Sequence, residues 1–91
     1  MALLWTETAR RDLQRLHDFL APVDRRAAAR ATSLLVMGVR KIPRHPRLGQ
    51  RLAEFEPREV RRLLIGHYEV RYEIRDRDVF VLRVWHAAED R

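Results

Sequence analysis

The stretch Tyr68-Glu69-Val70-Arg71-Tyr72-Glu73-Ile74-Arg75 alternates apolar and charged side chains along the chain. Successive side chains of a β-strand point to opposite faces of the sheet, so this period of two predicts a strand over residues 68–75. One face of the strand is expected to be buried and the other charged. This is the clearest periodic signal in the chain, and it indicates that the C-terminal third forms a sheet.

The segments on either side of this strand also have strand character. Val60 to Ile65 predicts a preceding strand, with Gly66-His67 as a tight turn between the two. After a short polar turn at residues 76–78, Val79 to Trp85 is apolar on both faces except at Arg83. Apolar side chains on both faces are typical of a central strand. The C-terminal third therefore predicts three consecutive strands joined by short turns.

The N-terminal half has a helical pattern. Leu3 to Trp5 is a short apolar run that predicts a first strand, and Thr6 is a plausible N-cap for the helix that follows. Four residues spaced at the helical period make the apolar face of this helix: Ala9, Leu13, Leu16 and Leu20. Ala21-Pro22 is expected to end it.

A second helix is expected from about Pro22 to about Arg40, with Pro22 at its start. Its expected apolar stripe consists of Ala27, Ala31, Leu34, Leu35 and Ile42. The small alanine side chains favour close packing of the two helices as an antiparallel hairpin. Pro43, Pro46 and Gly49 then predict a loop, which Leu52 and Phe55 attach to the core.

These elements give the order β-α-α-β-β-β and predict an α+β fold. We expect the helical hairpin to pack on one face of a curved, mostly antiparallel sheet. The chain has 91 residues, which is enough for one thin hydrophobic core, so residues 1–91 are expected to form a single domain.

The composition narrows the function classes. The formal net charge is +6, with 19 basic against 13 acidic residues, which favours an acidic partner such as a nucleic acid, a membrane surface or an acidic protein segment. The absence of cysteine excludes disulfides, thiol nucleophiles and thiolate zinc sites. We find no apolar run suited to a signal peptide or a membrane span, which is compatible with a cytoplasmic protein that has no membrane contact.

Common enzyme motifs are absent from the sequence. The histidines, which are His17, His45, His67 and His86, do not pair with one another at metal-ligand spacing. The three glycines are too widely spread for a phosphate-binding loop, and Ser33, the only serine, is far in sequence from any histidine. No metal or cofactor is therefore expected.

One cluster of polar residues near the C-terminus could form a functional surface. Its candidates are Arg61, Arg62, Arg83, Trp85, His86, Glu89, Asp90 and Arg91. If the last three strands form one sheet, Arg62, Arg83 and His86 could converge on a concave face, where they could bind a phosphodiester and assist proton transfer. The alternative interpretation is an exposed sheet face that needs charge for solubility.

Several segments together resemble a known family, the toxins of the ParE/RelE superfamily of type II toxin–antitoxin systems. The opening strand and helix start are similar at Trp5-Thr6, Ala9, Asp12 and Leu13, and so is the Pro43–Pro46–Gly49 loop. The more specific parts are Arg62 to Ile74, which resembles the central hairpin, and Val81 to Arg91, which resembles the closing strand and tail of plasmid-stabilisation toxins.

The resemblance implies a cytoplasmic toxin that forms a hetero-oligomer with a cognate antitoxin, whose acidic or disordered segment would complement the net charge of +6. It also implies a target. The tail from His86 to Arg91 looks more like the ParE branch, whose members poison DNA gyrase without catalysis of their own.

The alternative is a RelE-like, metal-independent endoribonuclease that cuts ribosome-bound mRNA. Under it, Arg62 and Arg83 would hold phosphate and His86 would act as general acid or base. RelE-like members typically have a basic residue just after the tyrosine of the third strand, where this chain has Glu69. A further alternative is a degenerate toxin that only binds its antitoxin as a co-repressor.

Overall fold

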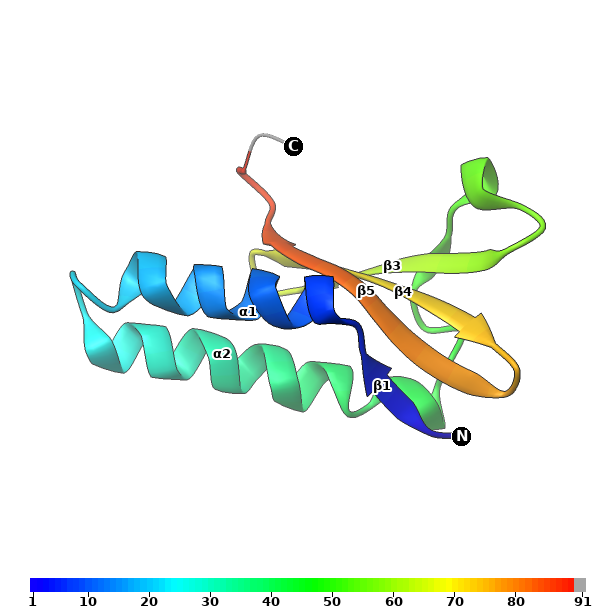
Figure 1. Ribbon diagram of the computed structural model, residues 1–91, viewed down its shortest axis with the longest axis horizontal. Coiled ribbons are helices and arrows are strands. Elements are labelled where there is room, and N and C mark those ends of the chain that lie inside the picture. Colours follow the sequence, from blue (N-terminus) through cyan, green and yellow to red (C-terminus); the bar gives the residue numbers. More distant parts are fainter. Residues whose placement is uncertain (90–91) are drawn as a thin grey trace.

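The computed structural model describes residues 1–89, and Figure 1 shows two long helices lying side by side against one face of a twisted sheet. The elements in chain order are β1 (Leu3–Trp5), α1 (Glu7–Leu20), α2 (Arg25–Val39), the 3₁₀ turn η1 (Ile42–Arg44), β2 (Gln50–Arg51), the 3₁₀ turn η2 (Ala53–Phe55), β3 (Glu59–Ile65), β4 (Tyr68–Arg75) and β5 (Asp78–His86). The strand order is β1-β5-β4-β3-β2, with β1 parallel to β5 and the other neighbours antiparallel. The predicted α+β fold and its mostly antiparallel sheet are confirmed.

The sheet has one strand that the sequence did not predict. β2 pairs with β3 through only two residues, Gln50 opposite Arg62 and Arg51 opposite Arg61.

The predicted strand over residues 68–75 is confirmed as β4, which is the middle strand of the sheet. β5 lies between β1 and β4, as its two apolar faces predicted, and it continues one residue past Trp85 to His86.

The first helix begins where its cap was predicted. The Thr6 side chain accepts a hydrogen bond from the Ala9 N–H at 3.1 Å, which satisfies one free donor of the first turn. Its hydroxyl also donates to the Val81 carbonyl at 2.9 Å and so ties the start of α1 to β5. The predicted end of the helix at Ala21-Pro22 is confirmed, because α1 ends at Leu20.

The second helix begins three residues later than predicted. Pro22 does not open it, because Asp24 is the N-cap and its carboxylate accepts hydrogen bonds from the Arg26 and Ala27 N–H groups at 2.9 and 3.1 Å. The predicted apolar stripe is also partly wrong, since Leu34 is 62% exposed. The residues of α2 that are buried are Ala28, Leu35 and Val39. The alanines in the first half of this helix range from buried Ala28 to exposed Ala29, so they do not mark its buried face.

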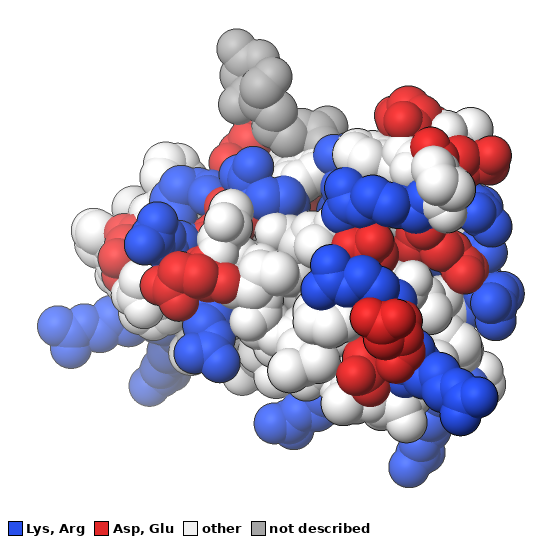
Figure 2. Space-filling view, turned by 45° about the vertical axis from the view of Figure 1, so that its right-hand side comes forward, with Lys and Arg blue, Asp and Glu red and all other residues white. Residues whose placement is uncertain are grey.

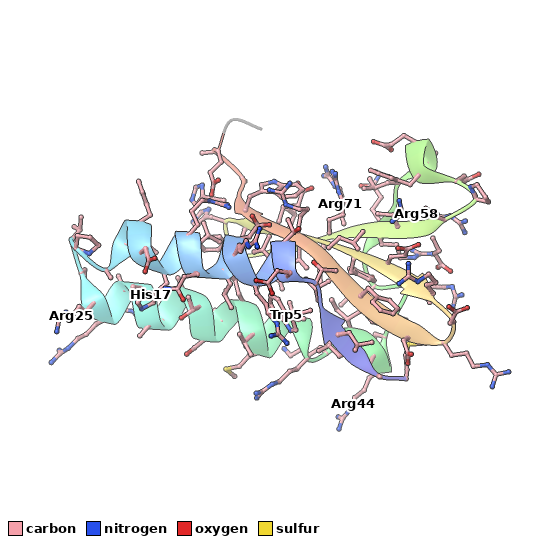
Figure 3. All side chains as sticks on the ribbon, viewed as in Figure 1. Trp5, His17, Arg25, Arg44, Arg58 and Arg71 are labelled. Atoms are coloured by element: carbon pink, nitrogen blue, oxygen red, sulfur yellow. The ribbon has the colours of Figure 1, made fainter. Side chains whose placement is uncertain are left out.

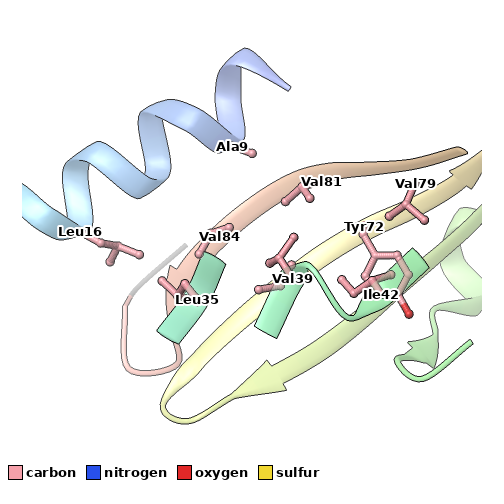
Figure 4. Packing of buried hydrophobic residues seen from close by; sticks show 10 residues of the cluster. Ala9, Leu16, Leu35, Val39, Ile42, Tyr72, Val79, Val81 and Val84 are labelled. Atoms are coloured by element: carbon pink, nitrogen blue, oxygen red, sulfur yellow. The ribbon is translucent and has the colours of Figure 1, made fainter. Parts of the chain in front are cut away.

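The hydrophobic core lies between the helical hairpin and the sheet, as Figure 4 shows. Its buried members are Ala9, Leu16, Leu35, Val39, Ile42, Val70, Tyr72, Val79, Val81 and Val84. Val70 and Tyr72 of β4 point toward the helices, so the charged residues between and beside them point to the opposite face of the sheet. This second face is therefore the one on which the predicted arginines have to be sought.

Candidate functional site

Three arginines form a row across the outer face of the sheet. Arg62 of β3 is opposite Arg71 of β4, and Arg71 is opposite Arg83 of β5. Adjacent strands lie about 4.8 Å apart, so the three side chains start from neighbouring positions on one face. Figure 3 shows Arg71 and Arg58 on the side of the sheet away from α2, with Arg58 closer to η2. We call Arg62, Arg71 and Arg83 the arginine row.

The arginine row lies over a buried aromatic side chain. Trp85 is only 2% exposed, and the Arg71 guanidinium lies 4.9 Å from the centroid of its ring. The same guanidinium is 5.3 Å from the Phe55 ring of η2, and that of Arg83 is 5.9 Å from Trp85. Cations over aromatic faces are attracted by the ring quadrupole. Trp85 therefore supports the arginines from beneath and is not an exposed platform.

Two buried glutamates accompany the arginines on this face. Glu69 is 5% exposed and lies 3.9 Å from Arg62 and 3.7 Å from Arg71. Glu73 is 3% exposed and accepts two hydrogen bonds from Arg58, at 2.9 and 3.0 Å. The hydrogen bonds from Arg58 outweigh the effect of burial and hold the pKa of Glu73 below its ordinary value. The charged face of β4 is thus largely covered, and its charges are partly neutralised.

Arg83 is held by a buried carboxylate of α1. Asp12 is 3% exposed and accepts hydrogen bonds from Arg83 Nε at 2.8 Å, Arg15 Nη1 at 2.6 Å and the Val84 N–H at 2.9 Å. Burial alone would raise the pKa of Asp12, but these hydrogen bonds outweigh it, and the pKa is lowered from its ordinary value. The second guanidinium nitrogen of Arg15 contacts Glu89 at 3.0 Å. One carboxylate thus joins α1 to β5, and Arg15 extends the link to the tail.

His86 lies on the other face of the sheet. It is opposite Tyr68 in the register, and its ring meets the Tyr68 ring edge-on at 5.2 Å and stacks with His67 at 6.1 Å. Its Nδ1 accepts a hydrogen bond from the Ala88 N–H at 3.0 Å. Together with Leu16, Phe19 and Leu20 of α1, His86 lines an apolar pocket beside the helical hairpin.

The expected convergence of Arg62, Arg83 and His86 does not occur. Because β5 continues to His86, residues 83 and 86, three apart, point to opposite faces. A bulge precedes Arg83: Arg71 is opposite Arg83 but Tyr72 is opposite Val81, so Leu82 is an extra residue in β5. This bulge places Arg83 on the outer face, although Val81, two residues earlier, faces the helices. The structure therefore brings Arg62 and Arg83 together and separates both from His86.

The remaining predicted candidates either make contacts within the fold or are not among the described residues. Arg61 donates to the Gly49 carbonyl at 2.7 Å and to Glu59 at 3.0 Å, on the helix-facing side of β3. Glu89 accepts from the His86 N–H at 3.0 Å in addition to its contact with Arg15. Asp90 and Arg91 lie outside the described residues.

Sequence reasoning missed four residues of this arrangement, namely Asp12, Arg58, Arg71 and Glu73. Asp12 could have been found, because it falls on the helix face of Ala9 and Leu16, where a charged residue is unusual.

Within residues 1–89, no cluster of three His, Asp or Glu side chains is suited to hold a metal ion. No helix in that same part of the chain is both long enough and apolar enough to cross a bilayer.

A helical hairpin packed on one face of a mostly antiparallel, five-stranded sheet defines the class of this protein as a small α+β fold. A solved structure titled "Chromosomal ParDE TA system from P. aeruginosa" has this fold: 94% of this chain aligns with 95% of that chain at a TM-score of 0.80 and 21% identity. The sequence model of the family described as "ParE toxin of type II toxin-antitoxin system, parDE" matches residues 3–91. The chain therefore belongs to the ParE toxin family, as its hairpin and tail predicted. No match was found among curated proteins.

Proposed function

We propose that the protein inhibits DNA gyrase by binding to it, and that a cognate antitoxin neutralises this activity in a toxin–antitoxin hetero-oligomer. Membership of the ParE toxin family, which the sequence model of that family shows over residues 3–91, supports the proposal. Residues 1–91 act as one domain in this proposal, and the site of action is the cytoplasm.

The separation of His86 from the arginine row is the observation that carries the proposal. A metal-independent ribonuclease needs its phosphate-binding cations and its general acid or base within reach of one phosphate. Here His86 faces the helix side of the sheet, whereas Arg62 and Arg71 face the other side. Arg83 is bound by Asp12, and Glu69 brings negative charge to the row. This arrangement favours binding over phosphodiester cleavage.

The test is a supercoiling assay with purified DNA gyrase and purified toxin, with and without the purified cognate antitoxin. We expect the toxin to stop supercoiling or to trap cleaved DNA, and we expect the antitoxin to restore supercoiling. Unchanged supercoiling at saturating toxin would contradict gyrase inhibition. If translation were also unaffected while the antitoxin bound tightly, the protein would be a co-repressor and not an active toxin.

The arginine row is the one observation that favours the second candidate, a ribosome-dependent mRNA interferase. Three guanidinium groups on one face could hold phosphate oxygens. Under this candidate, cleavage of ribosome-bound mRNA would fall by about 100-fold or more in both Arg62→Ala and His86→Ala, since each removes a catalytic contribution. The exposed Arg77→Ala is the matched control. Equal cleavage by His86→Ala and wild type would exclude this mechanism.

A further inference from the structure

The net charge of the protein is concentrated in one segment. Residues 25–44, which run from the start of α2 to the end of η1, contain no acidic residue and six basic residues: Arg25, Arg26, Arg30, Arg40, Lys41 and Arg44. Since the whole chain has 19 basic and 13 acidic residues, the rest of the chain holds 13 of each sign and is formally neutral. The net charge of +6 therefore corresponds to this segment alone.

None of these six cations is paired with a carboxylate in the part of the chain that the structure describes. All six are exposed, and none forms a salt bridge with another residue among residues 1–89. Figure 3 shows the side chains of Arg25 and Arg44, at the two ends of the segment, pointing away from the body of the protein. In Figure 2, blue side chains project from the left-hand and lower edges, whereas blue and red interleave at the upper right.

The outer face of α2 also carries exposed apolar side chains between the cations. Arg26, Arg30, Leu34 and Met37 follow one another at spacings of three or four residues, so they lie along one side of the helix, and Lys41 follows at the same spacing just beyond its end. Leu34 is 62% exposed and Met37 is 59% exposed. We call these five residues together with Arg25, Arg40 and Arg44 the α2 outer face.

The charge pattern of this face opposes the stability of the helix that carries it. Arg25 and Arg26 occupy the first turn of α2, which contains no acidic residue. The N-terminus of a helix has a partial positive charge, so cations there are unfavourable and anions favourable. Unneutralised cations along one helix side also repel one another. A partner that supplies negative charge would remove both costs.

We propose that the α2 outer face is the surface by which this toxin docks onto an acidic surface of its protein target. The six cations would attract and orient the target, and Leu34 with Met37 would form the apolar centre of the contact. The inference rests on the proposed function, so the target is DNA gyrase. The arginine row is a separate surface on the other side of the sheet, and it does not take part.

The apolar centre favours a protein partner over a nucleic acid. Protein interfaces have a desolvated core of large apolar side chains surrounded by a polar or charged rim. Leu34 and Met37 occupy such a central position between Arg26 and Arg30 on one side and Arg40 and Lys41 on the other. A surface for single-stranded nucleic acid would need aromatic side chains between its cations, and α2 contains none.

The first test is a charge reversal, Arg26→Glu with Arg30→Glu. Glutamate forms helices as well as arginine does and is favoured in a first helical turn, so α2 is expected to remain folded. We expect the dissociation constant for purified gyrase holoenzyme to rise by about 30-fold or more at low salt, and by less as salt is added. Arg10→Glu with Arg77→Glu is the matched control, because both arginines are exposed and neither forms a salt bridge within residues 1–89. The control is expected to bind within about threefold of wild type.

The second test removes an apolar contact without changing the charge. Leu34→Ser is expected to weaken gyrase binding about tenfold, with the same salt dependence as wild type, because an apolar contact is not screened by ions. Leu48→Ser is the control, since Leu48 is 57% exposed and lies outside α2. Thermal unfolding of each variant checks that a loss of binding does not reflect a loss of fold.

The outcomes separate the inference from the proposed function. If wild type inhibits gyrase and the Arg26→Glu, Arg30→Glu variant inhibits it equally well, the docking inference is overturned and the proposed function stands. If wild type does not bind gyrase, the proposed function fails and this assignment of the target fails with it. If the variant loses binding to duplex DNA or to the purified antitoxin but keeps its affinity for gyrase, the surface serves that other partner and the inference is also overturned.

Discussion

At the scale of single residues, Asp12 joins three parts of the molecule through one carboxylate. Its oxygens accept from Arg83, from Arg15 and from the backbone of Val84, beyond the point where β1 stops pairing with β5. The carboxylate thus satisfies a backbone donor at the outer edge of β5 that no strand covers. A buried charge of this kind is costly unless it is fully hydrogen-bonded, and Asp12 meets that condition.

We expect Asp12→Asn to lower the free energy of unfolding by about 2 kcal/mol, because an amide cannot accept from two guanidinium groups and the backbone at once. The value is at the low end for a buried pair, since both arginine side chains are nearly half exposed. Urea unfolding measures the change. Glu7→Gln, which removes an exposed carboxylate paired with Arg11, is the control and should cost less than about 0.5 kcal/mol. Equal effects of the two substitutions would show that Asp12 does not link α1 to β5.

A second residue-scale prediction concerns the Tyr72 hydroxyl. It donates to the Pro46 carbonyl at 2.7 Å and accepts from the Gly49 N–H at 2.9 Å, in a side chain that is fully buried. Tyr72→Phe should cost about 1–2 kcal/mol because both loop groups lose their buried partner. Tyr68→Phe is the control, since the Tyr68 hydroxyl makes no hydrogen bond within residues 1–89. A smaller loss for Tyr72→Phe than for the control, measured by urea unfolding, would contradict this role.

At the scale of elements, the helical hairpin depends on how α2 begins. The Asp24 carboxylate accepts from two N–H groups of the first turn, which itself contains Arg25 and Arg26 and no acidic residue. We expect Asp24→Ala to lower the free energy of unfolding by about 1 kcal/mol, and Asp24→Asn, which keeps the cap, to change it by a few tenths at most. Thermal or urea unfolding distinguishes the two. Equal losses in both variants would mean that the charge stabilises the helix and the cap geometry does not.

The elements that could be predicted from the sequence are those specified by local pattern. The alternation in β4, the turns beside it and the Thr6 cap depend on residues close together in the chain. β2 could not be predicted, because its two residues form a strand only through pairing with Arg61 and Arg62 of β3. The position of His86 was missed for a related reason: whether β5 ends at Trp85 or continues depends on its partner Tyr68, and that decides the face on which His86 lies.

At the scale of the whole molecule, the sheet separates two surfaces of different character. On its outer face, arginines pair with Glu69 and Glu73, and Arg71 lies over the rings of Trp85 and Phe55. On the far side of the helical hairpin, the cations of α2 have no such partners among residues 1–89. The net charge can be counted from the sequence, but which arginines are paired with carboxylates cannot. That depends on contacts across neighbouring strands and between α1 and β5.

The buried carboxylates give the whole molecule an expected dependence on pH. The pKa values of Asp12, Glu59 and Glu73 are each lowered in the folded protein. Burial raises the pKa at all three, but hydrogen bonds from arginines outweigh it, with help from the Val84 N–H at Asp12. The unfolded chain therefore binds protons at a higher pH than the fold does. Above the ordinary carboxyl pKa range of about 4 to 4.5, the three carboxylates are expected to make their full contribution to the free energy of unfolding. This contribution is expected to be lost as the pH falls through the lowered pKa values of the folded protein.

Urea unfolding measured from pH 7 down to pH 3 tests this dependence, and Asp12→Asn identifies the part that comes from the link between α1 and β5. Asparagine does not titrate, so the variant should lose less stability between pH 5 and pH 3 than wild type, and the two proteins should approach each other in acid. Glu7→Gln removes an exposed carboxylate and should run parallel to wild type over the same range. If Asp12→Asn also ran parallel to wild type, Asp12 would not be the carboxylate whose protonation loosens α1 from β5, and the pairs of Glu59 and Glu73 on β3 and β4 would be the next to be removed.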